Sequence, residues 1–173
     1  MIYIISGGID TGKTTALCGI YENLKSGDGV ASLKIFGNGQ FLGYRIKRLS
    51  DGESKIIALK TGAGDNDGYF IPDDDIAFSF GDFSFSERAF LFANRVITDT
   101  VDKNISPVFI DEIGPVELNG NGLCEGFVVA LNSGFDLYMV CREACIEAVI
   151  SHFKIETYKI IKPAPVTGQG GIL

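Results

Sequence analysis

Residues 1–15 have the sequence MIYIISGGIDTGKTT, and this stretch decides the fold. Residues 1–5 form an uninterrupted apolar, largely β-branched run, typical of a strand buried on both faces of a parallel sheet. Residues 7–14 match the pattern GxxxxGK[ST] in full. Apolar residues then recur at helical spacing over residues 13–25, and the polar, glycine-containing residues 26–29 end the pattern. The stretch therefore predicts a strand, a glycine-rich loop and a helix in direct succession.

A loop of this pattern is suited to binding phosphate. Its glycines let the backbone curl so that successive N–H groups point at a β-phosphate, with the positive end of the helix behind them. We expect Lys13 to neutralise the β and γ oxygens and the Thr14 hydroxyl to ligate Mg²⁺. A carboxylate repels phosphate, so the Asp10 side chain is expected to point outward. The predicted nucleotide-binding residues are Gly7, Gly8, Ile9, Asp10, Thr11, Gly12, Lys13, Thr14 and Thr15.

The middle of the chain changes from helical to β patterning. Residues 30–36, 41–49 and 55–59 are β-prone runs separated by turn sequences, which predicts an antiparallel hairpin insertion at about residues 30–61. The polar residues 62–68 are expected to form an exposed, mobile loop, and the phenylalanine-rich residues 78–85 a loop wedged onto the core. A helix is predicted at about residues 84–103, with Ser84 or Ser86 as its cap.

The remaining residues alternate between strand and helix patterns. The expected strands are residues 107–111, 135–141 and 157–161, and the expected helices are residues 121–132 and 143–153. This alternation predicts an α/β fold of the P-loop type, a three-layer sandwich with a mostly parallel sheet between helices. We expect one nucleotide-binding domain over residues 1–162 and a flexible tail over residues 163–173.

The strand at residues 107–111 ends in two carboxylates, Asp111 and Glu112. Ligands gather at the carboxyl ends of parallel strands, so this strand should deliver both groups to the phosphate loop. We expect Asp111 to support Mg²⁺ through its water shell and Glu112 to orient or deprotonate the attacking water. Because Thr14 and Asp111 must approach one Mg²⁺, the strands 1–6 and 107–111 are expected to be neighbours in one parallel sheet. Taken alone, the pair is also compatible with a solvent-exposed strand end.

Arg142 follows the predicted strand 135–141 at the edge of the sheet where the nucleotide is expected. It is the first candidate for an internal arginine finger, a group that stabilises charge in the transition state. A solvated residue at a helix start is the alternative interpretation.

The amino-acid composition of the chain argues against some classes of binding partner. The chain has 173 residues, 22 acidic against 15 Lys and Arg side chains, and a net charge of −7, which argues against binding nucleic acid. No segment has the length of a membrane span, and no signal-peptide pattern opens the chain. The four cysteines form no CxxC pair and lie in apolar stretches, so a reducing, cytoplasmic location is expected. No protein partner is predicted.

Residues 111–118, DEIGPVEL, resemble the DEIGxxEL signature of the cancer-related or thermophile-type nucleoside triphosphatases. The resemblance covers about residues 1–153 and includes the phosphate loop, the hairpin region and the helix before the signature. It implies hydrolysis of ATP, GTP and other nucleoside triphosphates to diphosphate and phosphate. Pro115 stands where that family usually has lysine.

Two other functions remain compatible with the sequence. A small nucleotide or nucleoside kinase has a similar loop and size, although such enzymes usually carry an arginine-rich lid. A nucleotide-dependent accessory switch is the other alternative, although the guanine-reading [NT]KxD sequence is missing.

Overall fold

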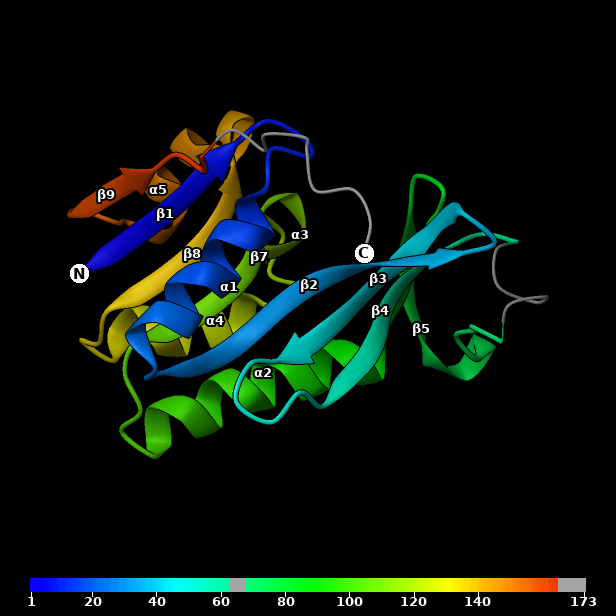
Figure 1. Cartoon of the computed structure of the whole chain (residues 1–173), viewed down its shortest axis with the longest axis horizontal. Helices are drawn as coiled ribbons and strands as arrows, with labels where there is room; N and C mark the ends of the chain where they lie inside the picture. The colour runs from blue at the N-terminus through cyan, green and yellow to red at the C-terminus, as the bar shows by residue number, and fades with distance from the viewer. Residues whose placement is uncertain (63–67, 165–173) are drawn as a thin grey trace, which may run out of the picture.

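The structure is a computed structural model, and it describes residues 1–62 and 68–164. Figure 1 shows a long sheet with helices on both sides. The strands are β1 (Ile2–Gly7), β2 (Asp28–Gly37), β3 (Gln40–Arg48), β4 (Ser54–Lys60), β5 (Ile76–Phe80), β6 (Phe83–Ser86), β7 (Val108–Ile113), β8 (Leu137–Arg142) and β9 (Tyr158–Ile161). The α-helices are α1 (Lys13–Leu24), α2 (Glu87–Asp102), α3 (Pro115–Leu118), α4 (Cys124–Asn132) and α5 (Ile146–Phe153). Short 3₁₀ turns cover η1 (Asp73–Asp75) and η2 (Glu143–Cys145).

Within the described residues, nine strands form one sheet in the order β5-β6-β4-β3-β2-β7-β8-β1-β9. The strands β2, β7, β8, β1 and β9 pair in parallel, whereas β3, β4, β6 and β5 continue the sheet in antiparallel pairs. The sheet is therefore mixed, and the prediction of a mostly parallel sheet is wrong for its second half. In Figure 1 the antiparallel part extends well beyond the helix-covered part.

One face of the parallel strands is covered by α1. Successive strand residues point to opposite faces, and Ile5, Phe109 and Val140 all point to this side. They pack with Leu17 of α1, and each of these four side chains is almost fully buried. This contact holds α1, and so the loop before it, against the carboxyl ends of β1 and β8.

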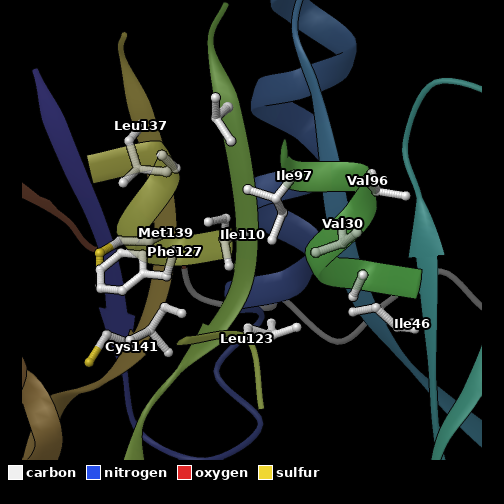
Figure 2. Packing of buried hydrophobic residues seen from close by; sticks show 14 of the residues in the cluster. Val30, Ile46, Val96, Ile97, Ile110, Leu123, Phe127, Leu137, Met139 and Cys141 are labelled. Carbon is white, nitrogen blue, oxygen red and sulfur yellow. The ribbon is translucent and has the colours of Figure 1, made fainter. Parts of the chain in front are cut away.

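The opposite face is covered by α2, α4 and α5. Figure 2 shows Val96 and Ile97 of α2 close to Val30 of β2 and Ile110 of β7, while Phe127 of α4 packs beside β8. The alternation of apolar residues along each strand accounts for this second core. Three layers result, with the parallel strands in the middle.

The expected adjacency of β1 and β7 is wrong, because β8 lies between them in the same sheet. Thr14 still reaches Asp111, since it belongs to α1, which packs across β8 as well as β1. Strand β2 also differs from the prediction: it pairs with β3 in a hairpin but is simultaneously the parallel partner of β7. It is thus part of the central sheet rather than part of an insertion.

Residues 78–85 form the hairpin β5–β6 instead of the expected loop. The predicted helix accordingly starts later, at Glu87, where the Ser86 hydroxyl accepts a hydrogen bond from the Ala89 N–H. Ser86 is therefore the cap that the sequence suggested as one of two options. Part of the loop expected at residues 62–68 and most of the tail expected at residues 163–173 lie outside the described residues. None of the helices in the described part of the chain is long and apolar enough to cross a membrane.

Candidate active site

The phosphate-binding loop joins β1 to α1 at the carboxyl edge of the sheet. Gly12 has φ of +80°, a left-handed conformation that suits glycine, and it precedes the first turn of α1. At Gly7 a Cβ would lie 2.5 Å from Thr11 Oγ1, so only glycine fits without a shift. No side chain of the described residues caps the first turn of α1. Its N–H groups are therefore suited to an anionic ligand.

Lys13 is held inside this loop, with 9 % of its surface exposed. Its ammonium group donates to the Gly8 carbonyl oxygen. The only positive charge of the loop is therefore already placed where phosphate oxygens are expected. The Asp10 side chain is 65 % exposed but lines the cleft, and its carboxylate pairs with Lys34 of β2.

Thr14 and Asp111 meet directly. The Thr14 hydroxyl donates to Asp111 Oδ2 at 2.6 Å, although the two residues are 97 positions apart. The Ser32 N–H also donates to Asp111 Oδ2 at 3.3 Å, and the Ser32 hydroxyl donates to the Asp111 carbonyl oxygen at 2.7 Å. Two elements, α1 and β2, thus orient one carboxylate at the end of β7.

Asp111 is only 2 % exposed, and burial raises the pKa of its carboxyl from 3.8 to about 7. The hydrogen bond from Thr14 opposes this shift, and the nearby Glu112 carboxylate adds to it. A cation beside Asp111 would favour its ionised form. The ionised form of the Asp111 carboxylate is therefore stabilised when a cation binds beside it.

The oxygens around Asp111 fit Mg²⁺, because the hydroxyls of Thr14 and Ser32 and a carboxylate are hard ligands of the type that this ion prefers. The described residues hold no cluster of three or more His, Cys, Asp or Glu side chains able to hold a metal by itself. Mg²⁺ commonly binds through one or two protein groups, with phosphate and water completing the octahedron. The site therefore fits a metal that arrives with a phosphate ligand.

Glu112 and Arg142 form an ion pair beside this group. Arg142 Nε lies 2.8 Å from Glu112 Oε1, and the two side chains are 51 % and 29 % exposed. Arg142 is the last residue of β8 and is the register partner of Gly7 at the end of β1. The strand order therefore brings both groups to the mouth of the phosphate loop.

These residues line one cleft of about 670 Å³. Its floor is the loop from Ile9 to Thr15, and its walls come from β2, β3, β4, β6 and the ends of β7 and β8. The predicted residues Lys13, Thr14, Glu112 and Arg142 all border this cleft. Asp111 lies just beneath it, bonded to Thr14.

A family model described as NTPase matches residues 2–164. The chain belongs to the NTPase family. Its activity is accordingly the hydrolysis of nucleoside triphosphates. Among solved structures, the chain is similar to the solution structure of a human cancer-related nucleoside triphosphatase. The TM-score is 0.60 and the identity is 14 %, over 94 % of this chain and 87 % of that one. At this identity the likeness shows the fold. No curated protein matches the sequence.

Two lysines of this NTPase were not singled out in the sequence, Lys34 on β2 and Lys60 on β4. Both line the cleft, and their ammonium groups lie 5.6 and 5.2 Å from the centre of the Phe41 ring. Lys34 is two residues after Ser32, so the strand alternation places both side chains on one face. That spacing is the signal that could have found Lys34; the place of Lys60 depends on the β3–β4 pairing.

Glu117 of the DEIGPVEL segment has a structural place in this NTPase. Its carboxylate accepts hydrogen bonds from the Gly114 N–H at 2.9 Å and the Leu123 N–H at 3.0 Å, and it is 5 % exposed. Burial raises its pKa to about 7. A Cβ at Gly122 would lie 2.4 Å from Glu117 Oε1, so the turn that supplies these contacts needs glycine there. Glu117 therefore fixes the chain that follows Asp111 and Glu112.

Proposed function

We propose that this chain hydrolyses the β–γ bond of a Mg²⁺-bound nucleoside triphosphate, releasing diphosphate and phosphate, in the cleft above α1. The observation that carries the proposal is the hydrogen bond between Thr14 and Asp111, which joins the phosphate loop to the carboxylate strand across one intervening strand. We also propose that residues 1–162 act as one nucleotide-binding domain. A cytoplasmic location is supported by four cysteines that are all free.

Binding begins at the loop. The N–H groups at the start of α1 surround the β-phosphate, and Lys13 exchanges its bond to the Gly8 carbonyl for the β and γ oxygens. Thr14 and, through water, Asp111 would hold Mg²⁺, which when bound neutralises charge on the β- and γ-phosphates. These contacts position the γ-phosphate below Glu112 and Arg142.

Glu112 prepares the attacking water. Arg142 contacts its Oε1, and either carboxylate oxygen can accept the proton once that contact is released. Arg142 borders the same cleft, and turning its guanidinium toward the γ-phosphate would stabilise negative charge there while releasing the Glu112 carboxylate. One ion pair therefore supplies both the base and the charge-stabilising group.

A phosphate-release assay with the common nucleoside triphosphates, with Mg²⁺ or with a chelator, tests this function. Lys13→Ala should reduce release to background because the loop loses its only point charge at the β and γ oxygens. Lys103→Ala, at the end of α2 outside both cleft and loop, is the control and should match the wild type. Activity of Lys13→Ala within a few-fold of wild type, or release that continues unchanged in the chelator, would contradict the proposal.

A further inference from the structure

A second cavity, of about 310 Å³, adjoins the phosphate cleft on the side of the β5–β6 hairpin. The two spaces share wall residues, which are Thr14, Ser32, Tyr44, Phe83, Glu112 and Arg142. Asp111 also borders the second cavity. One end of this cavity is therefore the place where the γ-phosphate and the attacking group meet.

The other end is apolar and aromatic. It is lined by Ile57 of β4, by Phe80 and Phe85 of the β5–β6 hairpin, by Phe90 of α2 and by Leu123, and Phe83 lies where the two spaces join. Phe85 and Phe90 stack at 6.0 Å with planes 10° apart, and Phe78 stacks on Phe85 at 4.9 Å. Phe83 is tilted by 54° to Phe85. The rings support one another, and the aromatic lining suits an aromatic ligand.

The charges around this cavity favour a neutral occupant. Arg142 is the cation among the described residues that line it, and Glu112 already engages that guanidinium at 2.8 Å. The carboxylate of Glu117 is occupied by two backbone N–H groups. A phosphorylated acceptor would meet Asp111 and Glu112 with no further cation to offset the repulsion. At 310 Å³ the space is at the small end of ligand pockets.

We propose that this cavity binds an uncharged, flat, mainly apolar alcohol whose hydroxyl replaces water as the acceptor of the γ-phosphoryl group. The inference rests on the proposed function, because it uses the same phosphate loop and the same base. The hydroxyl oxygen forms a bond to the γ-phosphorus, and the bond from that phosphorus to the β–γ bridging oxygen breaks. Glu112 takes the hydroxyl proton. The products are the phosphate monoester of the alcohol and the nucleoside diphosphate.

The test measures both reactions in one sample. Wild-type protein turns over Mg²⁺-ATP in the presence of naphthalen-2-ylmethanol, and phosphorus NMR separates free phosphate from the naphthylmethyl phosphate ester. Ethanol at equal concentration is the matched nucleophile, because it has a primary hydroxyl and no ring. Since binding raises the effective concentration of a hydroxyl at the γ-phosphate, ester from the naphthyl alcohol should exceed ethyl phosphate by roughly tenfold or more.

Two phenylalanine variants test the location. Phe80 lines the cavity mouth and is 67 % exposed, while Phe70 is 68 % exposed and lines neither space. Phe80→Ala should lower the ratio of ester to phosphate on the order of fivefold or more by removing an aromatic contact. Phe70→Ala should leave the ratio unchanged. Phe70→Ala, outside both spaces, is expected to leave the fold and ATP hydrolysis intact.

Several results would overturn the inference. Normal phosphate release with no excess of naphthyl ester over ethyl ester would remove the acceptor role and leave the proposed hydrolysis standing. Inhibition by the alcohol without ester formation would make the cavity a ligand site but not an acceptor site. A raised KM for ATP in Phe80→Ala would assign the cavity to the nucleotide itself. If the protein released no phosphate at all, the proposed function would fail. Ligand-observed NMR would then test whether the cavity binds the alcohol, and an absence of binding would contradict the inference.

Discussion

Glu112 and Arg142 hold each other at the mouth of the cleft, and each is also suited to act on the phosphate. An ion pair of this kind fixes the positions of the carboxylate and the guanidinium relative to each other. When a γ-phosphate enters, it competes with Glu112 for the guanidinium. The ion pair therefore positions both side chains, and Arg142 can then exchange its contact with Glu112 for a contact with the γ-phosphate.

Replacing Arg142 tests whether its guanidinium stabilises the transition state. Arg142→Ala should lower turnover on the order of 10²-fold while nucleotide affinity stays nearly intact, because charge on the transferring group develops only in the transition state. Single-turnover kinetics and titration with a non-hydrolysable ATP analogue measure the two quantities. Arg88→Ala is the control, since Arg88 makes an exposed ion pair with Asp74 far from the cleft. Weaker binding with unchanged turnover would instead assign Arg142 to nucleotide recognition.

Asp111 makes stability depend on pH. Its folded-state pKa of about 7 lies above the ordinary value of 3.8, so the folded protein holds a proton that the unfolded chain releases between these values. The corresponding stability is complete below about pH 4 and is lost as pH rises through 7. The Asp111→Asn variant has no carboxyl group at this position, so this part of the pH dependence of stability is absent from it.

Thermal unfolding of the metal-free protein between pH 4 and 8 measures this effect. The Tm difference between Asp111→Asn and wild type should rise in favour of the variant as pH increases through this range. The pKa of Glu117 is also raised, but Glu117 is present in both proteins, so its contribution to the pH dependence of Tm cancels in the comparison. Two Tm curves that stay parallel over the whole range would show that burial of Asp111 carries no such cost.

At the scale of elements, the phosphate loop and β2 are joined by the pair of Asp10 and Lys34 at 2.6 Å. The side chains are 65 % and 38 % exposed, so the pair is a partly solvated link rather than a buried one. Lys34 borders the cleft, and the Asp10 carboxylate of the loop holds its ammonium group there. The link therefore competes with the nucleotide for one cation.

Two substitutions separate the partners of this link. Asp10→Asn should tighten binding of a non-hydrolysable ATP analogue by about two- to fivefold, because it frees Lys34, and Lys34→Met should weaken binding by a similar factor. Isothermal titration measures both. If both variants weaken binding equally, the pair shapes the loop, and Lys34 has no contact with phosphate.

The chain as a whole is acidic, with a net charge of −7, yet cations outnumber carboxylates in the lining of its cleft, which has Lys13, Lys34, Lys60 and Arg142 against Asp10 and Glu112. A cleft that concentrates one sign of charge raises the local concentration of an oppositely charged ligand. The strand order makes this possible, because the four cations come from α1, β2, β4 and β8. The antiparallel extension of the sheet is therefore part of the site as well as of the fold.

The phosphate loop and the carboxylate strand could be predicted because each depends on local sequence and on a fixed neighbouring element. The order of the strands could not, since β8 enters between β1 and β7 from a segment that carries no motif. The hairpin β5–β6 had a readable signal: phenylalanines alternate with small residues on both sides of Gly81-Asp82, which is turn chemistry. Lys34 on β2 had a local signal in its spacing from Ser32, whereas the place of Lys60 on β4 depends on the pairing of β3 with β4, which no local pattern indicates.

We propose that Glu112 prepares water for attack on the γ-phosphate. Glu112→Gln tests this role, because the change keeps the shape of the side chain and removes its basicity. Glu143→Gln, at an exposed carboxylate paired with Lys162, is the control. In a single-turnover assay with Mg²⁺-ATP, Glu112→Gln should bind nucleotide like the wild type and cleave it on the order of 10²-fold more slowly. Cleavage at the wild-type rate by Glu112→Gln would contradict the account.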